Sequence, residues 1–387
     1  MNKKAIAILG GIFILIIGTL GVIIYLRSTG DEEPVTSEET PPVVIQEPVI
    51  DFPDFEEPAP VPTTGSGATR LTDEAVITPA LFFQGNGIAY FNRQGQLFRT
   101  DMAVSGSTVL LSNKTEITVP SKSGISKILW PLVGQSFIAE SGVGLARQWS
   151  YYNPETGTYV ELPRQVKSLS WMPNGSKIVF VWVDDNENAT LNMSNPDTTE
   201  YQLLSELYDN DIEIMVSPDG NTIAYYRNQN TNLSENGLFT VSADGQTWGT
   251  ITREGYNRGV LWSPDSRKLL FTKRDVSGTS TLWMADLASS QVKSLGVNST
   301  EAKAVWSRDS QSVVVAVPSS GGVSSGQTSD SIAKIDVMSG SKTEFSLGSG
   351  VDAQELFMNL EESILFFRNA QDGSLYYLFL TSPSSAF

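Results

Sequence analysis

The chain has 387 residues, a formal net charge of −17, and neither cysteine nor histidine. Without these two residue types there are no disulfides, no thiolate or imidazole metal sites, and no nucleophile activated by a histidine. The acidic balance also argues against nucleic-acid binding, which needs a basic surface. The functions that remain possible are carboxylate chemistry, hard-cation binding by oxygen ligands, and binding without catalysis.

The first segment predicts a membrane anchor. Residues 1–4 form a short tail with Lys3 and Lys4, and residues 5–26 carry no charge. As a helix this stretch covers about 33 Å, enough for a hydrocarbon core of about 30 Å. A cleaved signal peptide is the alternative, but its apolar stretch is usually about 7–15 residues long. The two lysines outweigh Arg27, so the positive-inside rule places the tail in the cytoplasm and all later residues outside it.

Residues 27–68 predict an extended linker. Between positions 28 and 69 there are ten acidic residues, eight prolines, and no lysine or arginine. This composition buries no core, and like-charge repulsion keeps it extended. We therefore expect a spacer between a single-pass anchor in a bacterial cell membrane and an extracellular domain at the cell envelope.

Residues 69–381 repeat one pattern, in which Trp-Ser-Pro-Asp precedes a short apolar strand. The repeat positions equivalent to Trp262 are 82, 130, 171, 216, 262, 306 and 357. Their spacing is close to that of four-stranded propeller blades. The sequence thus predicts an all-β fold, a seven-bladed β-propeller. Residues 70–74 align with 250–254, so we expect residues 69–75 to supply the outer strand of the last blade, and residues 382–387 to be a tail.

The Trp-Ser-Pro-Asp-Ser/Gly pattern resembles the repeat of the TolB-like propellers, which is also found in the N-terminal propellers of prolyl peptidases. The clear copies start at Ser170, Met215, Leu261 and Val305. The resemblance implies a WD-like propeller with a binding role, and it implies no named activity.

The repeated residues have structural interpretations. Tryptophans that recur at blade spacing indicate packing, and aspartates at equivalent turn positions indicate turn capping. The residues are Trp171, Trp262, Trp306, Asp219, Asp265 and Asp309. The segment 322–326 matches a Gly-x-Ser-x-Gly nucleophile elbow, but the sequence has no histidine to activate Ser324.

A binding surface is predicted from loop length. Within a blade, the turns between strands one and two are short, whereas the connections between strands two and three are longer and varied. The long connections share one face of a propeller, and loops on a rigid scaffold collect binding groups. The candidate binding residues on this face are Arg147, Asp184, Asp185, Glu187, Arg227, Lys273 and Arg274. The acidic run 184–188 lacks the glycine and final glutamate of an EF-hand, which favours a solvated connection over a calcium site.

The sequence therefore predicts a membrane-anchored propeller that binds a protein, a peptide or a cell-envelope polymer. We expect no catalysis, no cofactor, no metal site and no nucleic-acid partner. The alternative is a carboxylate-based enzyme that acts on glycan at the mouth of the propeller channel. An acidic pair in a pocket, one member with a raised pKa, would distinguish the enzyme from the binding module.

Overall fold

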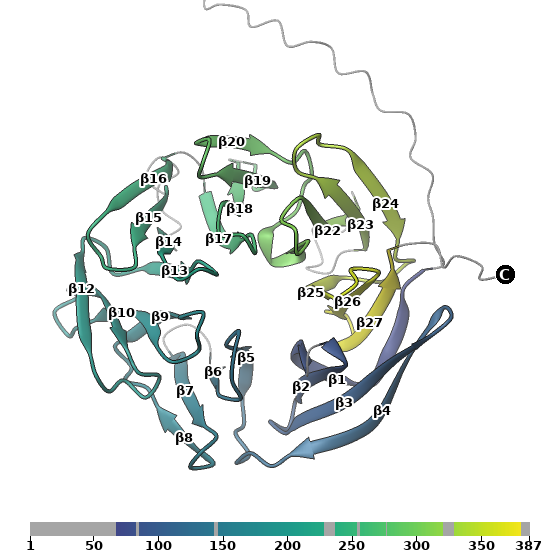
Figure 1. Cartoon of the computed structure of the whole chain (residues 1–387), viewed down its shortest axis with the longest axis horizontal. Coiled ribbons are helices and arrows are strands. Elements are labelled where there is room, and N and C mark those ends of the chain that lie inside the picture. The colour runs from purple at the N-terminus through teal and green to yellow at the C-terminus, as the bar shows by residue number, and fades with distance from the viewer. Residues whose placement is uncertain are drawn as a thin grey trace, which may run out of the picture. The chain divides into compact units, whose positions relative to one another are not determined.

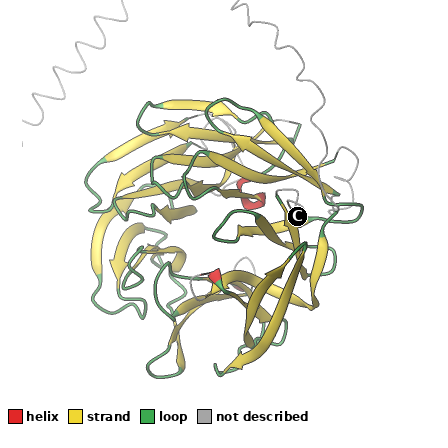
Figure 2. Ribbon diagram, turned by 45° about the vertical axis from the view of Figure 1, so that its right-hand side comes forward, coloured by secondary structure: helices red, strands yellow, loops and turns green. Residues whose placement is uncertain are grey.

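Strands dominate the structure, a computed structural model. It describes residues 67–82, 85–142, 146–227, 237–253, 256–275, 277–319 and 329–380, with the backbone alone for 256–258. The 3-10 helix η3 (Glu301–Lys303) is a short interruption in this all-β chain. The all-β class predicted from the sequence is confirmed, as Figure 2 shows by its strand colour.

The membrane anchor is not tested by the structure. In the described part of the chain, no helix is long and apolar enough to cross a membrane. The predicted anchor at 5–26 lies outside the described residues, as do the tails at 1–4 and 382–387 and the linker up to residue 66.

Five antiparallel sheets follow one another along the chain, each made of four consecutive strands. The first two contain β5 (Ile125–Leu129), β6 (Phe137–Ser141), β7 (Gln148–Asn153), β8 (Thr158–Glu161), β9 (Val166–Trp171), β10 (Ile178–Val183), β11 (Ala189–Ser194) and β12 (Gln202–Leu207). The next two contain β13 (Ile212–Val216), β14 (Thr222–Arg227), β15 (Leu238–Ser242), β16 (Trp248–Thr252), β17 (Tyr256–Trp262), β18 (Lys268–Arg274), β19 (Ser280–Asp286) and β20 (Gln291–Ser294). The fifth contains β21 (Ala304–Trp306), β22 (Ser312–Pro318), β23 (Asp330–Asp336) and β24 (Lys342–Ser346).

A sixth sheet joins the two ends of the described chain. Its strand order is β25-β26-β27-β1-β2-β3-β4. The strands are β25 (Ala353–Met358), β26 (Ile364–Asn369), β27 (Ser374–Phe379), β1 (Thr69–Phe82), β2 (Gly87–Asn92), β3 (Leu97–Ser105) and β4 (Thr108–Ile117). The first half of β1 pairs with β27, with Thr69 opposite Tyr377, and its second half pairs with β2. The long strand β1 thus pairs with β27, near the end of the chain, and with β2, the strand that follows it.

The sheets are arranged around a common centre. In Figure 1, β5, β9, β13, β17 and β25 lie nearest this centre, and β8, β12, β16, β20 and β24 lie toward the outside. The second strands are apolar along most of their length, because neighbouring sheets cover both of their faces. Phe180 in β10 and Phe271 in β18 are fully buried, and each such side chain contributes about 1.5–3 kcal/mol. The core therefore lies between adjacent sheets.

The repeated tryptophans connect neighbouring sheets by hydrogen bonds. Trp171 Nε1 donates to the Leu129 carbonyl at 2.9 Å, and Trp262 Nε1 donates to the Met215 carbonyl at 3.0 Å. Trp306 makes the same bond to Leu261, at 3.2 Å. All three rings are buried. In each bond, the acceptor comes immediately before the equivalent repeat position in the preceding sheet, so one sequence feature sets both the packing and the alignment of adjacent sheets.

Candidate functional site

A cavity of about 760 Å³ lies among the inner strands and is lined by residues of β5, β9, β13, β17, β21 and β25. These strands run in the same direction, since each begins beside the connection between strands two and three of its sheet. The register shows this: Ile125 is opposite Ser141, and Ile212 is opposite Arg227. The cavity therefore has one end where the inner strands begin and another where they end, and we call it the channel.

Charged side chains gather where the inner strands begin, and we call this the charged end. Arg147 Nε lies 3.0 Å from Glu140 Oε1, and Arg147 Nη1 lies 3.0 Å from Glu213 Oε1. Ser168 Oγ donates to the other Glu213 oxygen at 2.8 Å. Burial alone lowers the pKa of Arg147, but the two carboxylates outweigh burial and raise it. The guanidinium is thus a fixed positive charge clamped between two sheets.

Glu301 of η3 lines the same channel. Its backbone N–H donates to Thr272 Oγ1 at 3.1 Å, and the Thr272 hydroxyl donates in return to the Glu301 carboxylate. Burial raises the pKa of Glu301, and the hydrogen bonds from Thr272 and from nearby backbone N–H groups offset only part of this effect. The side chain remains partly exposed to the channel. Glu301 is therefore a carboxyl that favours its neutral form more than a surface glutamate does.

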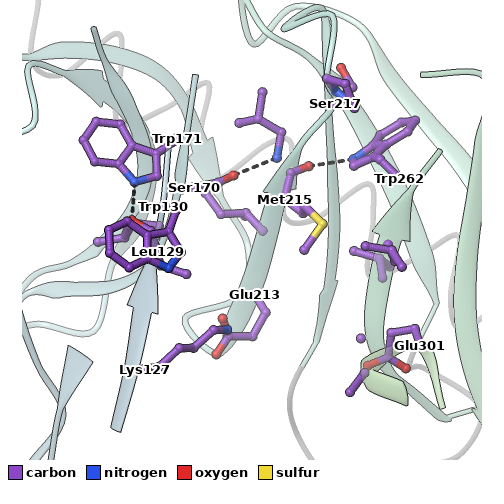
Figure 3. A pocket seen from close by; sticks show the side chains of 18 of the residues that line it. Lys127, Leu129, Trp130, Ser170, Trp171, Glu213, Met215, Ser217, Trp262 and Glu301 are labelled. Atoms are coloured by element: carbon purple, nitrogen blue, oxygen red, sulfur yellow. Dashed lines mark hydrogen bonds between the residues drawn. The ribbon is translucent and has the colours of Figure 1, made fainter. Parts of the chain in front are cut away.

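Tyr226 of β14 is the third polar group of this end. Burial raises the pKa of its hydroxyl, and the negative charges of Glu213 and Glu301 raise it further. The phenol therefore stays a hydrogen-bond donor. Figure 3 shows Glu213 and Glu301 at one end of the channel, away from the hydrogen bonds of Trp171 and Trp262.

The opposite end of the channel is apolar. It is formed by the turns that follow the inner strands, with Leu132, Met172, Pro173 and Pro218 among its lining residues. Leu132 is 72% exposed. A ligand in the channel would therefore meet fixed polar groups at one end and apolar walls beyond them, the usual composition of a ligand pocket.

Of the binding residues predicted from the sequence, Arg147 is the one that lines this channel. Asp184 caps its own turn, where it accepts hydrogen bonds from the N–H groups of Asn186 and Asn188. The side-chain hydrogen bond from Asn188 is the largest cause that lowers the pKa of Asp184. Asp185 and Glu187 are exposed in the same turn.

The remaining predicted cations, Arg227, Lys273 and Arg274, contact residues of their own loop or of neighbouring strands and loops. Arg227 pairs with Asp209, and Lys273 Nζ lies 4.1 Å from the centroid of the Trp283 ring. Arg274 Nε donates to the Gly278 carbonyl at 3.0 Å. Asp209 and Glu187 line a separate polar groove of about 610 Å³. The structure therefore divides the predicted residues between the channel, this groove and single loops; the segments 228–236 and 320–328, with Ser324, lie outside the described residues.

The repeated aspartates are turn caps. Asp219, Asp265 and Asp309 each accept a hydrogen bond from the serine two residues earlier, at 2.5, 2.6 and 2.5 Å. Each also accepts a backbone N–H from the residue two positions later. Burial raises the pKa values of Asp219 and Asp265, but these hydrogen bonds stabilise the ionised form and outweigh it, so the pKa values of all three aspartates are lowered.

Sequence reasoning missed Glu213, Tyr226 and Glu301. For Glu213 a signal was present in the repeat: the position three residues before the one equivalent to Trp262 is polar or glycine in six of the seven copies. These positions are Lys127, Ser168, Glu213, Gly259, Lys303 and Gln354. Three of these residues, Lys127, Glu213 and Gly259, line the channel, so the position is one from which an inner strand can reach it.

No protein-family model and no curated protein matches the chain. Among solved structures, it is similar to an oligogalacturonate lyase in complex with manganese, with a TM-score of 0.59 and 12% identity over 84% of this chain and 97% of that one. It is also similar to the tricorn protease, with a TM-score of 0.50 and 15% identity over 81% of this chain and 34% of that one. TolB from Acinetobacter baumannii matches with a TM-score of 0.41 and 15% identity over 79% of each chain. At these identities the likeness concerns the fold, and at that level the similarity to the lyase confirms the resemblance to TolB-like propellers.

The described residues do not fit a manganese site like the one named for the lyase. The sequence has no histidine or cysteine. Among the residues that the structure describes, no group of three or more Asp or Glu side chains is placed to hold a metal ion. We therefore derive no chemistry through a metal.

Proposed function

We propose that this chain, which has the fold of the TolB-like propellers, is a binding module that holds a protein, a peptide or a cell-envelope polymer at the charged end of its channel. The observation that carries the proposal is the clamped Arg147. Its two ion pairs come from Glu140 and Glu213 on different sheets, so the polar groups of the pocket are preorganised. A preorganised site reduces the entropy cost of binding.

The ring is best counted as seven blades. Five blades are the four-stranded sheets, and the seven-stranded sheet supplies two blades that share β1. Residues 69–75 then form the outer strand of the last blade, in support of which Thr69, Arg70 and Ala75 have partners on β27. Under this assignment, the propeller domain extends from 69 to 381.

The proposed location is the outside of a bacterial cell membrane. The uncharged stretch at 5–26 would anchor the chain with the tail 1–4 in the cytoplasm, and the acidic linker 27–68 would hold the propeller away from the membrane. Protease added to intact cells should then release the propeller. A soluble product that begins after residue 26 in untreated cells would contradict the anchor.

The binding face is tested by in-cell cross-linking of the full chain. One variant shortens both the 228–236 and the 320–328 connections, and a matched variant alters the tight turns at 217–220 and 243–246 on the opposite face. We expect partner capture to fall at least tenfold in the first variant and to remain in the second, with both still folded by thermal melting. Unchanged capture in the first and loss in the second would place the site on the other face.

A second function is supported by one observation: Glu213 and Glu301 line one pocket, and the pKa of Glu301 is raised by burial. In a carboxylate-based glycosidase, Glu301 would be the acid and Glu213 the base or nucleophile. Against this role, the Glu213 carboxylate already accepts from both Arg147 and Ser168. Release of reducing ends from envelope polysaccharide by the full chain, abolished in Glu301→Gln, would establish the enzyme.

A further inference from the structure

Glu301 differs from the other carboxylates of the channel. Glu140 and Glu213 pair with Arg147, and Glu355 pairs with Arg368 at 3.0 Å. Glu301 also lines the channel, but among the described residues it forms no ion pair, and the partner that holds its carboxylate is the neutral hydroxyl of Thr272.

The position of Glu301 is built into the channel wall. Thr272 is fully buried and both accepts from and donates to Glu301. The inner strand beside it has glycine at 259, and a Cβ there would come within 1.8 Å of Glu301 Oε1. A glycine and a buried threonine thus hold the carboxyl at a fixed point of the wall.

The surroundings of Glu301 suit a positively charged group of a bound ligand. Tyr226 lies within electrostatic reach of Glu301 and Glu213, and its oxygen and ring face add weaker acceptors for a cation. Figure 3 places Lys127 on the side of Glu213, across the channel from Glu301. No basic side chain among the described residues therefore neutralises Glu301, although each of its counterparts in the channel is neutralised.

The form of the site favours an ammonium group over a guanidinium. One oxygen of Glu301 is already engaged by Thr272, which disfavours the two parallel hydrogen bonds that arginine makes. An ammonium is a compact point charge on a flexible apolar stem. Met215 and Leu261 also line the channel, and such walls suit a four-carbon stem.

We propose that Glu301, with Tyr226, binds the side-chain ammonium of a lysine from a peptide or protein partner that enters the charged end of the channel. This assignment rests on the proposed binding function and specifies its ligand. The carboxylate would then gain the cation that Glu140, Glu213 and Glu355 already have.

The test is calorimetric titration of the full chain in detergent micelles with blocked tripeptides. The probes are acetyl-Gly-Lys-Gly-amide, the norleucine analogue that lacks the charge, and the glutamate analogue. We expect the lysine peptide to bind at least tenfold more tightly than the other two. Glu301→Gln should remove this preference, while Glu344→Gln, the same change at an exposed position, should leave it intact.

Three outcomes would overturn the assignment: equal binding of the three peptides, an unchanged lysine preference in Glu301→Gln, or equal binding of a glucosamine oligomer, which would assign the ammonium to a polymer. Glu301→Gln is expected to fold, because the amide has the size of the carboxyl and its oxygen can still accept from the Thr272 hydroxyl. If lysine binding fails while partner capture still depends on the long connections, this inference alone is wrong. If that dependence fails too, the proposed function is wrong.

Discussion

Glu301 occupies the space that a side chain at position 259 would take. A Cβ on Gly259 would lie 1.8 Å from Glu301 Oε1, so the two residues, 42 positions apart in the sequence, fit together only because one of them is glycine. The connection before β21 thus supplies a carboxyl to a wall whose own strand, β17, has no side chain at that point.

Gly259→Ala should therefore push Glu301 away from Thr272. We expect a loss of about 1–3 kcal/mol in the free energy of unfolding, the usual cost of overpacking. In a Glu301→Ala background, the same change should cost less than about 0.5 kcal/mol, because the clash is gone. Urea unfolding of the four proteins gives the coupling energy. Equal costs in both backgrounds would show that the two residues do not interact.

Trp262→Phe should destabilise the propeller beyond the loss of apolar area. The substitution keeps a buried ring but removes the Nε1–H that donates to Met215. Loss of one buried hydrogen bond that leaves a carbonyl without its donor costs about 1–3 kcal/mol. Trp248→Phe is the matched control, because Trp248 is 43% exposed, and its cost should be within about 0.5 kcal/mol of zero. Similar denaturant midpoints for the two variants would contradict the role of the hydrogen bond.

Stability should fall in acid through the turn aspartates. Asp219, Asp265 and Asp309 have pKa values below the ordinary 3.8 in the folded protein. Their contribution is therefore complete above pH 3.8 and is lost as the pH falls through the folded pKa values. The triple Asn variant should show a smaller loss of melting temperature between pH 6 and pH 3 than the wild type. An identical pH profile would mean that other carboxylates cause the acid sensitivity.

Removal of the part of β1 that pairs with β27 should strongly destabilise the propeller. Deletion of residues 69–76 exposes the edge of β27 and also removes the Thr72 hydroxyl that accepts from the Leu375 N–H. We expect the melting temperature to fall on the order of 10 °C or more. Deletion of 31–62, a larger loss of chain within the linker, should change it by less than about 2 °C. Equal melting temperatures would show that β1 does not close the ring.

The sequence predicted the general fold well because the repeat is local. The copies at Trp262 and Trp306 contain the Trp, the turn aspartate and the apolar second strand at fixed spacing, and the other copies keep part of this pattern. The channel was harder to predict, because it is assembled from different copies. Glu213 and Glu301 are separated by 88 positions, and Glu301 lies in a connection that has no counterpart in the repeat pattern. Arg147 was predicted from loop length, whereas its two partners required the arrangement of the sheets.

The shared strand β1 also has a mechanical consequence. With the proposed linker ahead of the propeller, a pull on the chain would reach first Ala68, whose N–H donates to the Leu347 carbonyl at 3.1 Å, and then Thr69 and Arg70, which pair with β27. The Arg70 side chain reinforces this point, since it donates to the Thr72 and Asp73 carbonyls and to Ser374 Oγ. The same strand continues into pairing with β2. Under the proposed anchoring, tension would therefore act where β1 joins β27, and a load too large for those bonds would open the propeller.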